Sequence, residues 1–354
     1  MSTTVTAVLP EHVAVDHVLA DFLEQKQDRH SDDPVVVMLI GMLREFLSGG
    51  KRLRPVLCIC GWRAGGGGEE KPYPMVVRIA ASLELFHTFA LIHDDVMDES
   101  LTRRGRPTVQ QAVTTLHSDH PRPAWFGTST AILLGDLTLG WSYELVQAAE
   151  LDAGKAARLW PALDDMRAQT LSGQYRDLLA TGGRRCTVEQ ALDIVRRKTA
   201  AYTVEHPLLL GALLAGADRE VLAACSTYGR ALGEAFQLRD DLLGVFGDPS
   251  VTGKPVTDDL REAKATVLLA IARQRADACQ RARLDALVGD PALDQDGATE
   301  AAWILTTTGA RAAVEQMIDK RCRRAMAVLS GGRLHPAAAP LLGDLVAGTA
   351  HRSR

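Results

Sequence analysis

The sequence contains no sustained alternation of apolar and polar residues, the pattern of a half-buried β-strand. Apolar residues recur instead at helical spacing, and no internal repeat is evident. A chain of 354 residues is long enough for one large helical domain or two smaller ones. We expect an all-α fold, with a flexible N-terminus at residues 1–15 and a single domain over residues 16–354.

Other absences narrow the class of protein. The formal net charge is only -4, which disfavours general nucleic-acid binding and favours basic residues that act as local phosphate ligands. No run of 18 uncharged apolar residues marks a membrane span, and the N-terminus lacks a basic segment followed by an apolar core. The six cysteines have neither metal-site nor disulfide spacing, as expected of reduced, mostly buried thiols. A cytoplasmic protein is predicted.

What the sequence does contain is two acidic clusters, far apart, each at the end of an apolar helical run. The first, Asp94-Asp95-Val96-Met97-Asp98, ends the stretch 75–93, which has no Gly or Pro. Asp94 and Asp98 are four residues apart, so both project from one helix face. Acids are disfavoured at the negative end of a helix dipole, so a cation is expected there. A solvated acidic helix end is the alternative.

Arginines follow the first cluster closely. Arg103, Arg104 and Arg106 lie on a segment broken by Gly105 and Pro107. Guanidinium groups bind phosphate oxygens bidentately. Acids that hold metal beside arginines that hold phosphate predict a site for a metal-bridged phosphate ester, with salt bridges inside the motif as the alternative.

A second basic turn, Gly49-Gly50-Lys51-Arg52-Leu53-Arg54-Pro55, follows the helical segment 35–47. Its glycines allow the backbone to approach a ligand, and Lys51 and Arg54 are spaced to point the same way on the first turn of a new helix. The turn suits a second anion, although a basic surface turn is the alternative. It is not a Walker P-loop, whose spacing is absent.

The second acidic cluster is Asp240-Asp241, followed by Leu-Leu-Gly244. Gln237 precedes it by about one turn, so its amide shares a face with the carboxylates. Gly and Pro residues then end the helix in a basic loop, from which Lys254 and Lys264 could reach a metal-bound diphosphate.

Together these motifs resemble the trans-prenyltransferases, the isoprenyl diphosphate synthase family that condenses isopentenyl diphosphate with an allylic diphosphate. The resemblance covers residues 35–270 and also includes Ser172-Gly173-Gln174 with Asp177, and Lys198-Thr199 within a helical run. It implies an isoprenoid synthase fold, a single helical bundle around a deep apolar cavity. The two acidic motifs would face each other across the cavity mouth, and the chain would form a homodimer.

The resemblance also implies individual roles. The Mg²⁺ ligands would be Asp94, Asp98 and Asp240, supported by Asp95 and Asp241. Isopentenyl diphosphate would be held by Lys51, Arg54, His87 and Arg104. The allylic diphosphate would be held or polarised by Arg103, Lys198, Thr199, Gln237, Lys254 and Lys264. The catalytic set would be Asp94, Asp98, Arg103, Lys198, Asp240 and Lys254.

The chain departs from the family pattern at one position. Gly244 stands where the second motif often has a third Asp, so weaker or differently arranged metal binding is expected. Asp248 is a candidate substitute, although Gly247 and Pro249 place it beyond the helix.

Product length should depend on the helix that carries the first motif. Phe89 and Ala90, five and four residues before it, resemble the pattern of geranylgeranyl diphosphate synthases, which extend dimethylallyl, geranyl or farnesyl diphosphate. A helical wheel places Phe86 closer to the cavity face than Phe89, so ordinary core packing of Phe89 stays open.

Three alternative functions remain. One is a farnesyl diphosphate synthase. A class I terpene cyclase is disfavoured by the second Asp-Asp and by the basic turn 49–55, since it needs no second diphosphate pocket. A non-catalytic regulatory subunit of a heteromeric synthase is suggested by Gly244 alone.

Overall fold

The computed structural model describes residues 10–68, 74–181, 186–247 and 258–351, and within these ranges it is almost entirely helical. The elements are α1 (Pro10–Arg29), α2 (Pro34–Leu47), α3 (Leu53–Ala64), α4 (Pro74–Met97), β1 (Thr102–Arg103), β2 (Arg106–Pro107), α5 (Val109–Leu116), α6 (Pro123–Gln147), α7 (Ala153–Ala180), α8 (Val188–Ile194), η1 (Val195–Glu205), α9 (His206–Leu214), α10 (Arg219–Phe246), α12 (Asp258–Arg261), α13 (Val267–Arg275), α14 (Ala278–Leu287), α15 (Gln295–Thr307), α16 (Ala310–Ser330), η2 (Pro336–Ala338) and α17 (Ala339–His351). The expected all-α class is confirmed, and the described strands form a single hairpin with two residues in each strand.

The N-terminal boundary needs correction. Helix α1 begins at Pro10, inside the stretch expected to be flexible. Val15 is completely buried, and Glu11 accepts a hydrogen bond from Arg63 of α3 at 2.5 Å. Residues 10–15 are therefore helical because one face of α1 packs on the protein interior.

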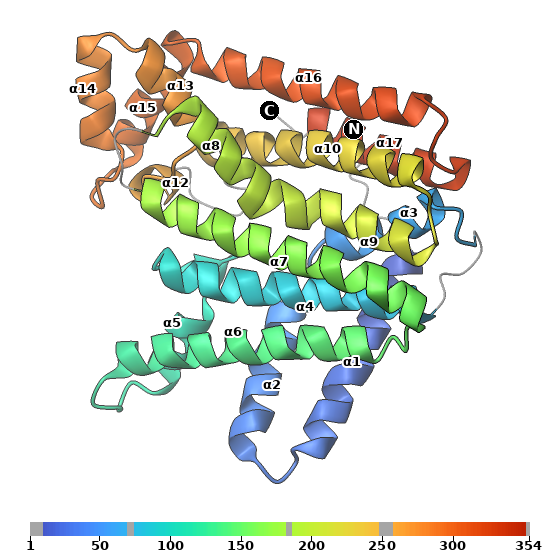
Figure 1. The fold of residues 1–354 in the computed structure, drawn as a ribbon. Helices are drawn as coiled ribbons and strands as arrows, with labels where there is room; N and C mark the ends of the chain where they lie inside the picture. The colour runs from blue at the N-terminus through green and yellow to red at the C-terminus, as the bar shows by residue number, and fades with distance from the viewer. Residues whose placement is uncertain (1–9, 69–73, 182–185, 248–257, 352–354) are drawn as a thin grey trace.

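The long helices lie in layers (Figure 1). Helix α4 packs on α6, and α10 packs on α16 and on η1, which also contacts α7. Helix α4 is long and apolar enough to span a membrane, but most of its apolar stretch is buried inside the protein. Its apolar residues therefore serve as core, and the acidic motif lies at its C-terminal end.

Two groups of buried apolar residues form the core, and helices α3 and α9 contribute to both. Leu57 and Leu208 belong to the group around α10 and α16, whereas Ile59 and Leu210 belong to the group around α4 and α6. The α3 and α9 backbones cross closely: a Cβ on Gly61 would lie 2.0 Å from the Leu208 carbonyl oxygen. Only glycine permits this crossing.

The η1 segment is a π-helix of 11 residues between α7 and α10. π-Helical turns are rare in proteins, and those that occur are often found at functional sites. Glycines on both neighbours let it pack closely. A Cβ on Gly173 of α7 would lie 2.2 Å from the backbone nitrogen of Lys198. A Cβ on Gly233 of α10 would lie 2.8 Å from the Ala200 Cα. Gly173, from the Ser-Gly-Gln motif, thus sets the position of Lys198.

We predict that Gly173→Ala lowers the free energy of unfolding by about 1–3 kcal/mol, because the new Cβ would clash with backbone that cannot turn aside. Urea denaturation measures this. The control is Gly140→Ala in α6, where no atom lies within 4 Å of the new Cβ. It should stabilise by about 0.5–1 kcal/mol, since alanine favours a helix. A Gly173→Ala protein as stable as wild type would contradict the close packing.

Candidate active site

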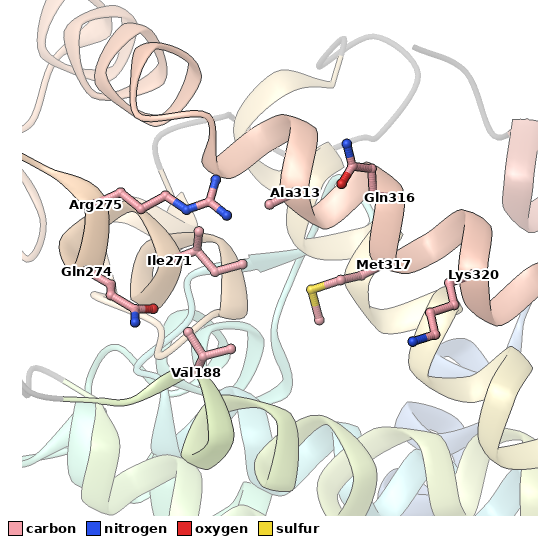
Figure 2. A pocket seen from close by; sticks show the side chains of 8 residues that line it. All are labelled: Val188, Ile271, Gln274, Arg275, Ala313, Gln316, Met317 and Lys320. Carbon is pink, nitrogen blue, oxygen red and sulfur yellow. The ribbon is translucent and has the colours of Figure 1, made fainter.

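A pocket of about 400 Å³ lies between α4, α7, η1 and α10, with the segment before α13 as a further wall. Most of the predicted site residues line it: Arg54, His87, Phe89, Ala90, Asp94, Arg103, Arg104, Lys198, Thr199, Gln237, Asp240, Asp241 and Lys264. A second pocket of similar volume lies between α8, α13 and α16 (Figure 2). Its lining has no acidic residue and none of the predicted site residues, so we place the candidate active site in the first pocket.

Asp94 is held by residues from two other helical segments. Its Oδ1 accepts hydrogen bonds from Lys198 Nζ at 3.0 Å and from Gln174 Nε2 at 3.1 Å. Lys198 also donates to Asp177 at 2.6 Å. Burial would raise the pKa of Asp94, but Lys198, Lys264 and Arg103 outweigh burial and lower it, so Asp94 is ionised at neutral pH.

The lysine responds in the opposite direction. Burial would lower the pKa of Lys198, but the charges of Asp94 and Asp177 raise it above its ordinary value, so the ammonium stays charged. Its side chain is only 21% exposed. The ordinary expectation for one helical lysine, a solvated side chain, therefore does not hold here.

Asp95 and Arg103 form a bidentate ion pair, with both contacts at 2.7 Å. Asp95 is only 1% exposed, and Gln110 donates to its backbone carbonyl. Arg103, positioned by the β1–β2 hairpin, also lies 4.0 Å from Asp94. For Asp95, then, the salt bridge inside the motif is present, and this carboxylate orients an arginine toward Asp94.

Asp98 follows the end of α4 and lies 3.7 Å from Lys264. Burial and the neighbouring charge of Asp94 raise the pKa of Asp98 to about 6. Its side chain is 15% exposed, so the alternative of a solvated acidic helix end is wrong.

In the second cluster, Gln237 donates to Asp241 Oδ1 at 2.8 Å, as the spacing predicts. Burial, with the charges of Asp259 and Asp240, raises the pKa of Asp241 to about 7, although the Gln237 hydrogen bond opposes this. Asp240 lines the pocket beside it. Lys254 and Asp248 lie outside the described residues.

Another part of the pocket is basic. Arg54 donates to Thr203 at 2.7 Å, and its guanidinium lies 4.5 Å from the Tyr202 ring centre. The Tyr202 hydroxyl lies 3.3 Å from His87 Nδ1. Burial, then Arg54 and three other arginines, lower the pKa of His87 well below its ordinary value, so this imidazole is neutral.

Arg104 belongs to the same basic region. Burial lowers its pKa, Glu84 opposes this, and the charges of Arg103, Arg52 and Arg54 lower it further. Guanidinium groups that repel one another favour a bound anion.

The basic turn has divided roles. Arg52 is buried and paired with Asp16 and Glu84, each at 2.8 Å, so it anchors the turn. Arg54 enters the pocket, whereas Lys51 precedes α3, is exposed and is not in the pocket lining. The expectation that Lys51 and Arg54 share the first helical turn is therefore wrong.

Left-handed backbone occurs beside several of these residues. Arg52, Arg104 and Ala263 have φ angles of 45°, 52° and 51°. Side chains other than glycine adopt this region at a cost in free energy, and such strain clusters at functional sites. Ala263 directly precedes Lys264, so the strained backbone helps to direct the Lys264 side chain toward the pocket.

The protein side chains alone do not complete a Mg²⁺ site. Among the described residues, no three His, Cys, Asp or Glu side chains converge closely enough to hold a metal. The acidic motifs supply carboxylate oxygens, and Mg²⁺ characteristically binds through one or two carboxylates, water and substrate phosphate. The residues therefore suit Mg²⁺ that arrives with a diphosphate. The individual ligand assignments stay predictions.

Three residues of the site were given no individual role from the sequence, although Gln174 and Asp177 belong to the motifs that carry the resemblance. Gln174 and Asp177 lie three apart on α7, a spacing that could have indicated a shared face. Tyr202 comes from η1, whose π-helical turns change which residues share a face, so helical spacing carried no usable signal.

The sequence is similar to those of known proteins. A family model described as polyprenyl synthetase matches residues 37–304. A geranylfarnesyl diphosphate synthase from Aeropyrum pernix is 34% identical over 319 residues, which are 89% of this chain and 92% of that protein. A geranylgeranyl diphosphate synthase from Mycobacterium tuberculosis is 36% identical over 80% of this chain and 75% of its own length.

The fold is similar to that of a solved structure. A geranylgeranyl pyrophosphate synthase from Corynebacterium glutamicum, crystallised with isoprenyl diphosphate and magnesium, superimposes with a TM-score of 0.91. It is 37% identical, and the match covers 97% of this chain and 98% of that one.

We predict that Mg²⁺ affinity, measured with inorganic pyrophosphate present, rises with pH. Asp98 and Asp241, with pKa values of about 6 and about 7, must lose their protons before they can attract a cation. Binding should be at least about 10-fold weaker at about pH 5.5 than at about pH 8. Isothermal titration calorimetry measures this, and affinity constant across that range would contradict it.

Proposed function

The chain belongs to the polyprenyl synthetase family, and we propose that it uses Mg²⁺ to condense isopentenyl diphosphate with an allylic diphosphate and yields mainly geranylgeranyl diphosphate. It is a prenyltransferase with the isoprenoid synthase fold. One observation carries the proposal. A single pocket combines a carboxylate and lysine region around Asp94 with an arginine region around Arg54 and Arg104, which suits two diphosphates bound by different means.

The chain's own residues account for the steps. Lys198 and Arg103 lie beside Asp94, where they can bind the allylic diphosphate and stabilise the charge that develops as its C–O bond breaks. Mg²⁺, when bound, supplies further positive charge to that leaving group. Arg54 and Arg104 hold isopentenyl diphosphate so that its double bond attacks the allylic cation and forms the new C–C bond.

The remaining proton needs an acceptor. The intermediate loses this proton to the released diphosphate, so no protein base is required. Neutral His87, hydrogen-bonded to Tyr202, adds polarity at the pocket wall without adding charge. The apolar part of the pocket excludes water that would quench the cation.

Phe89 is the residue that limits the length of the product. Phe89 is 5% exposed and lines the pocket together with Ala90. Phe86 does not line the pocket. The centre of its ring lies 5.6 Å from that of Phe89 and 6.0 Å from that of Tyr202. This arrangement supports Phe89, rather than Phe86, as the floor against which the growing chain stops.

The alternatives predict other outcomes. A farnesyl product would require the floor to stop a shorter chain, and product analysis separates the two. A cyclase would release a cyclic hydrocarbon without isopentenyl diphosphate. A regulatory subunit would be inactive alone, although the paired Lys198, Arg103 and Asp94 favour catalysis.

We also propose a cytoplasmic homodimer. Exposed apolar side chains on α6 support self-association, among them Trp125, Ile132 and Leu133. Apolar surface of this kind is common at interfaces between copies of a chain.

The purified chain should convert isopentenyl diphosphate and each of dimethylallyl, geranyl and farnesyl diphosphate, with Mg²⁺, into a C20 product detected by chain-length analysis. Asp94→Asn should lower kcat by about 1,000-fold, because it removes the charge around which the site is organised. The variant should still fold. Near-normal turnover by Asp94→Asn would sink the assignment, and absence of product from wild type would sink the proposed function.

Phe89→Ala should lengthen the product beyond C20, because truncation opens the pocket floor. Phe86→Ala is the matched control, since it removes the same ring from a position outside the lining. Mass spectrometry of the products decides. A longer product from Phe86→Ala alone would move the floor to that residue.

A further inference from the structure

Gly244 leaves a notch in α10 at the third position of the second acidic motif. The notch is filled by another part of the chain. A Cβ built on Gly244 would lie 1.9 Å from Asp259 Oδ2 and 3.0 Å from its Cγ. The Asp259 carboxylate therefore occupies the volume that a side chain at position 244 would otherwise take.

We propose that Asp259 is the third carboxylate of the second acidic motif, supplied from α12 instead of from α10, and that it takes part in binding the Mg²⁺-diphosphate complex. This inference rests on the proposed function. Asp240, Asp241 and Gly244 are on one helix, and the Asp259 oxygen lies against the Gly244 Cα, four residues after Asp240. The Asp259 carboxylate thus supplies a negative charge beside Gly244, the position where the family often has a third Asp.

The surroundings of Asp259 connect it to the first motif as well. Its Oδ1 lies 3.4 Å from Lys264 Nζ, and the same nitrogen lies 3.7 Å from Asp98 Oδ2. One ammonium group thus lies between carboxylates of both motifs. Lys264 therefore contacts a carboxylate of the first motif, and Asp259 reaches the first motif through this lysine.

The segment that carries Asp259 is firmly anchored. Leu260 is 1% exposed in the core, and its carbonyl accepts a hydrogen bond from the Gly289 nitrogen at 2.8 Å. Arg261 donates twice to the Leu293 carbonyl, at 3.0 Å and 2.5 Å. The segment between α14 and α15 therefore anchors the α12 backbone that carries Asp259.

The geometry also predicts what a side chain at position 244 would displace. Alanine there would expel the Asp259 oxygen at 1.9 Å, although every carboxylate in the chain would be kept. If Asp259 were shortened to alanine, only its Cβ would remain, 3.6 Å from the new Cβ, which is an ordinary contact. A side chain at position 244 would then no longer meet the Asp259 carboxylate.

The test is Mg²⁺ binding in the presence of inorganic pyrophosphate, measured by isothermal titration calorimetry on the full chain. Asp259→Asn should weaken Mg²⁺ affinity by about 10-fold or more, a loss typical of residues that support a metal site. Gly244→Ala should show a loss of similar size. The double variant Gly244→Asp/Asp259→Ala should recover to within about 3-fold of wild type.

Glu262→Gln is the matched control, because Glu262 also pairs with Lys264, at 2.8 Å, whereas the three atoms nearest to a Cβ on Gly244 all belong to Asp259. Its Mg²⁺ affinity should stay within about 2-fold of wild type. An equal loss in Glu262→Gln would mean that Asp259 acts only by pairing the lysine, which overturns the proposal. Unchanged affinity in Asp259→Asn overturns it too, and this variant keeps the side-chain shape even if Gly244→Ala fails to fold.

The two failures are distinguishable. A wild-type chain that makes prenyl diphosphate while Asp259→Asn binds Mg²⁺ normally refutes only the role of Asp259. A wild-type chain that binds Mg²⁺ with pyrophosphate but makes no product refutes the proposed function.

Discussion

Burying several carboxylates in one pocket costs free energy unless cations lie among them, and this constraint shapes the site. Lys198 from η1 joins Asp94 of α4 to Asp177 of α7, and Lys264 joins Asp98 to the segment that follows α12. Each ammonium therefore ties together elements distant in the sequence. The same groups are assigned to the allylic diphosphate, so the cations that stabilise the folded pocket also set the potential that a substrate meets.

Close backbone packing makes these ion pairs possible. The wide π-helical η1 lies against α7 and α10 at glycines, and without Gly173 the Lys198 backbone would have to move away from α7. A lysine displaced by even one ångström would lose much of its interaction with Asp94, because charge-assisted hydrogen bonds are short and directional. Glycines that do not line the pocket thus position the charged side chain that does.

Much of this could be predicted from the sequence. The acidic motif at the end of the run 75–93, the basic turn 49–55 between two helices and the convergence of the motifs all follow from local pattern and from the family resemblance. The role of Tyr202 could not, because helical spacing assumes an α-helix. Nor could the contact of Asp259 with Gly244, since a pattern shows which carboxylate is missing but not which distant one packs into its place.

Helix α3 has a consequence for the molecule as a whole. It is a shared wall of both core clusters, locked to α9 where Gly61 meets Leu208. Because α3 packs in both clusters, unfolding of one cluster would expose apolar residues of the other. We therefore expect the two clusters to unfold together. The pocket, which draws residues from both halves, is therefore protected from local opening by the stability of the entire bundle.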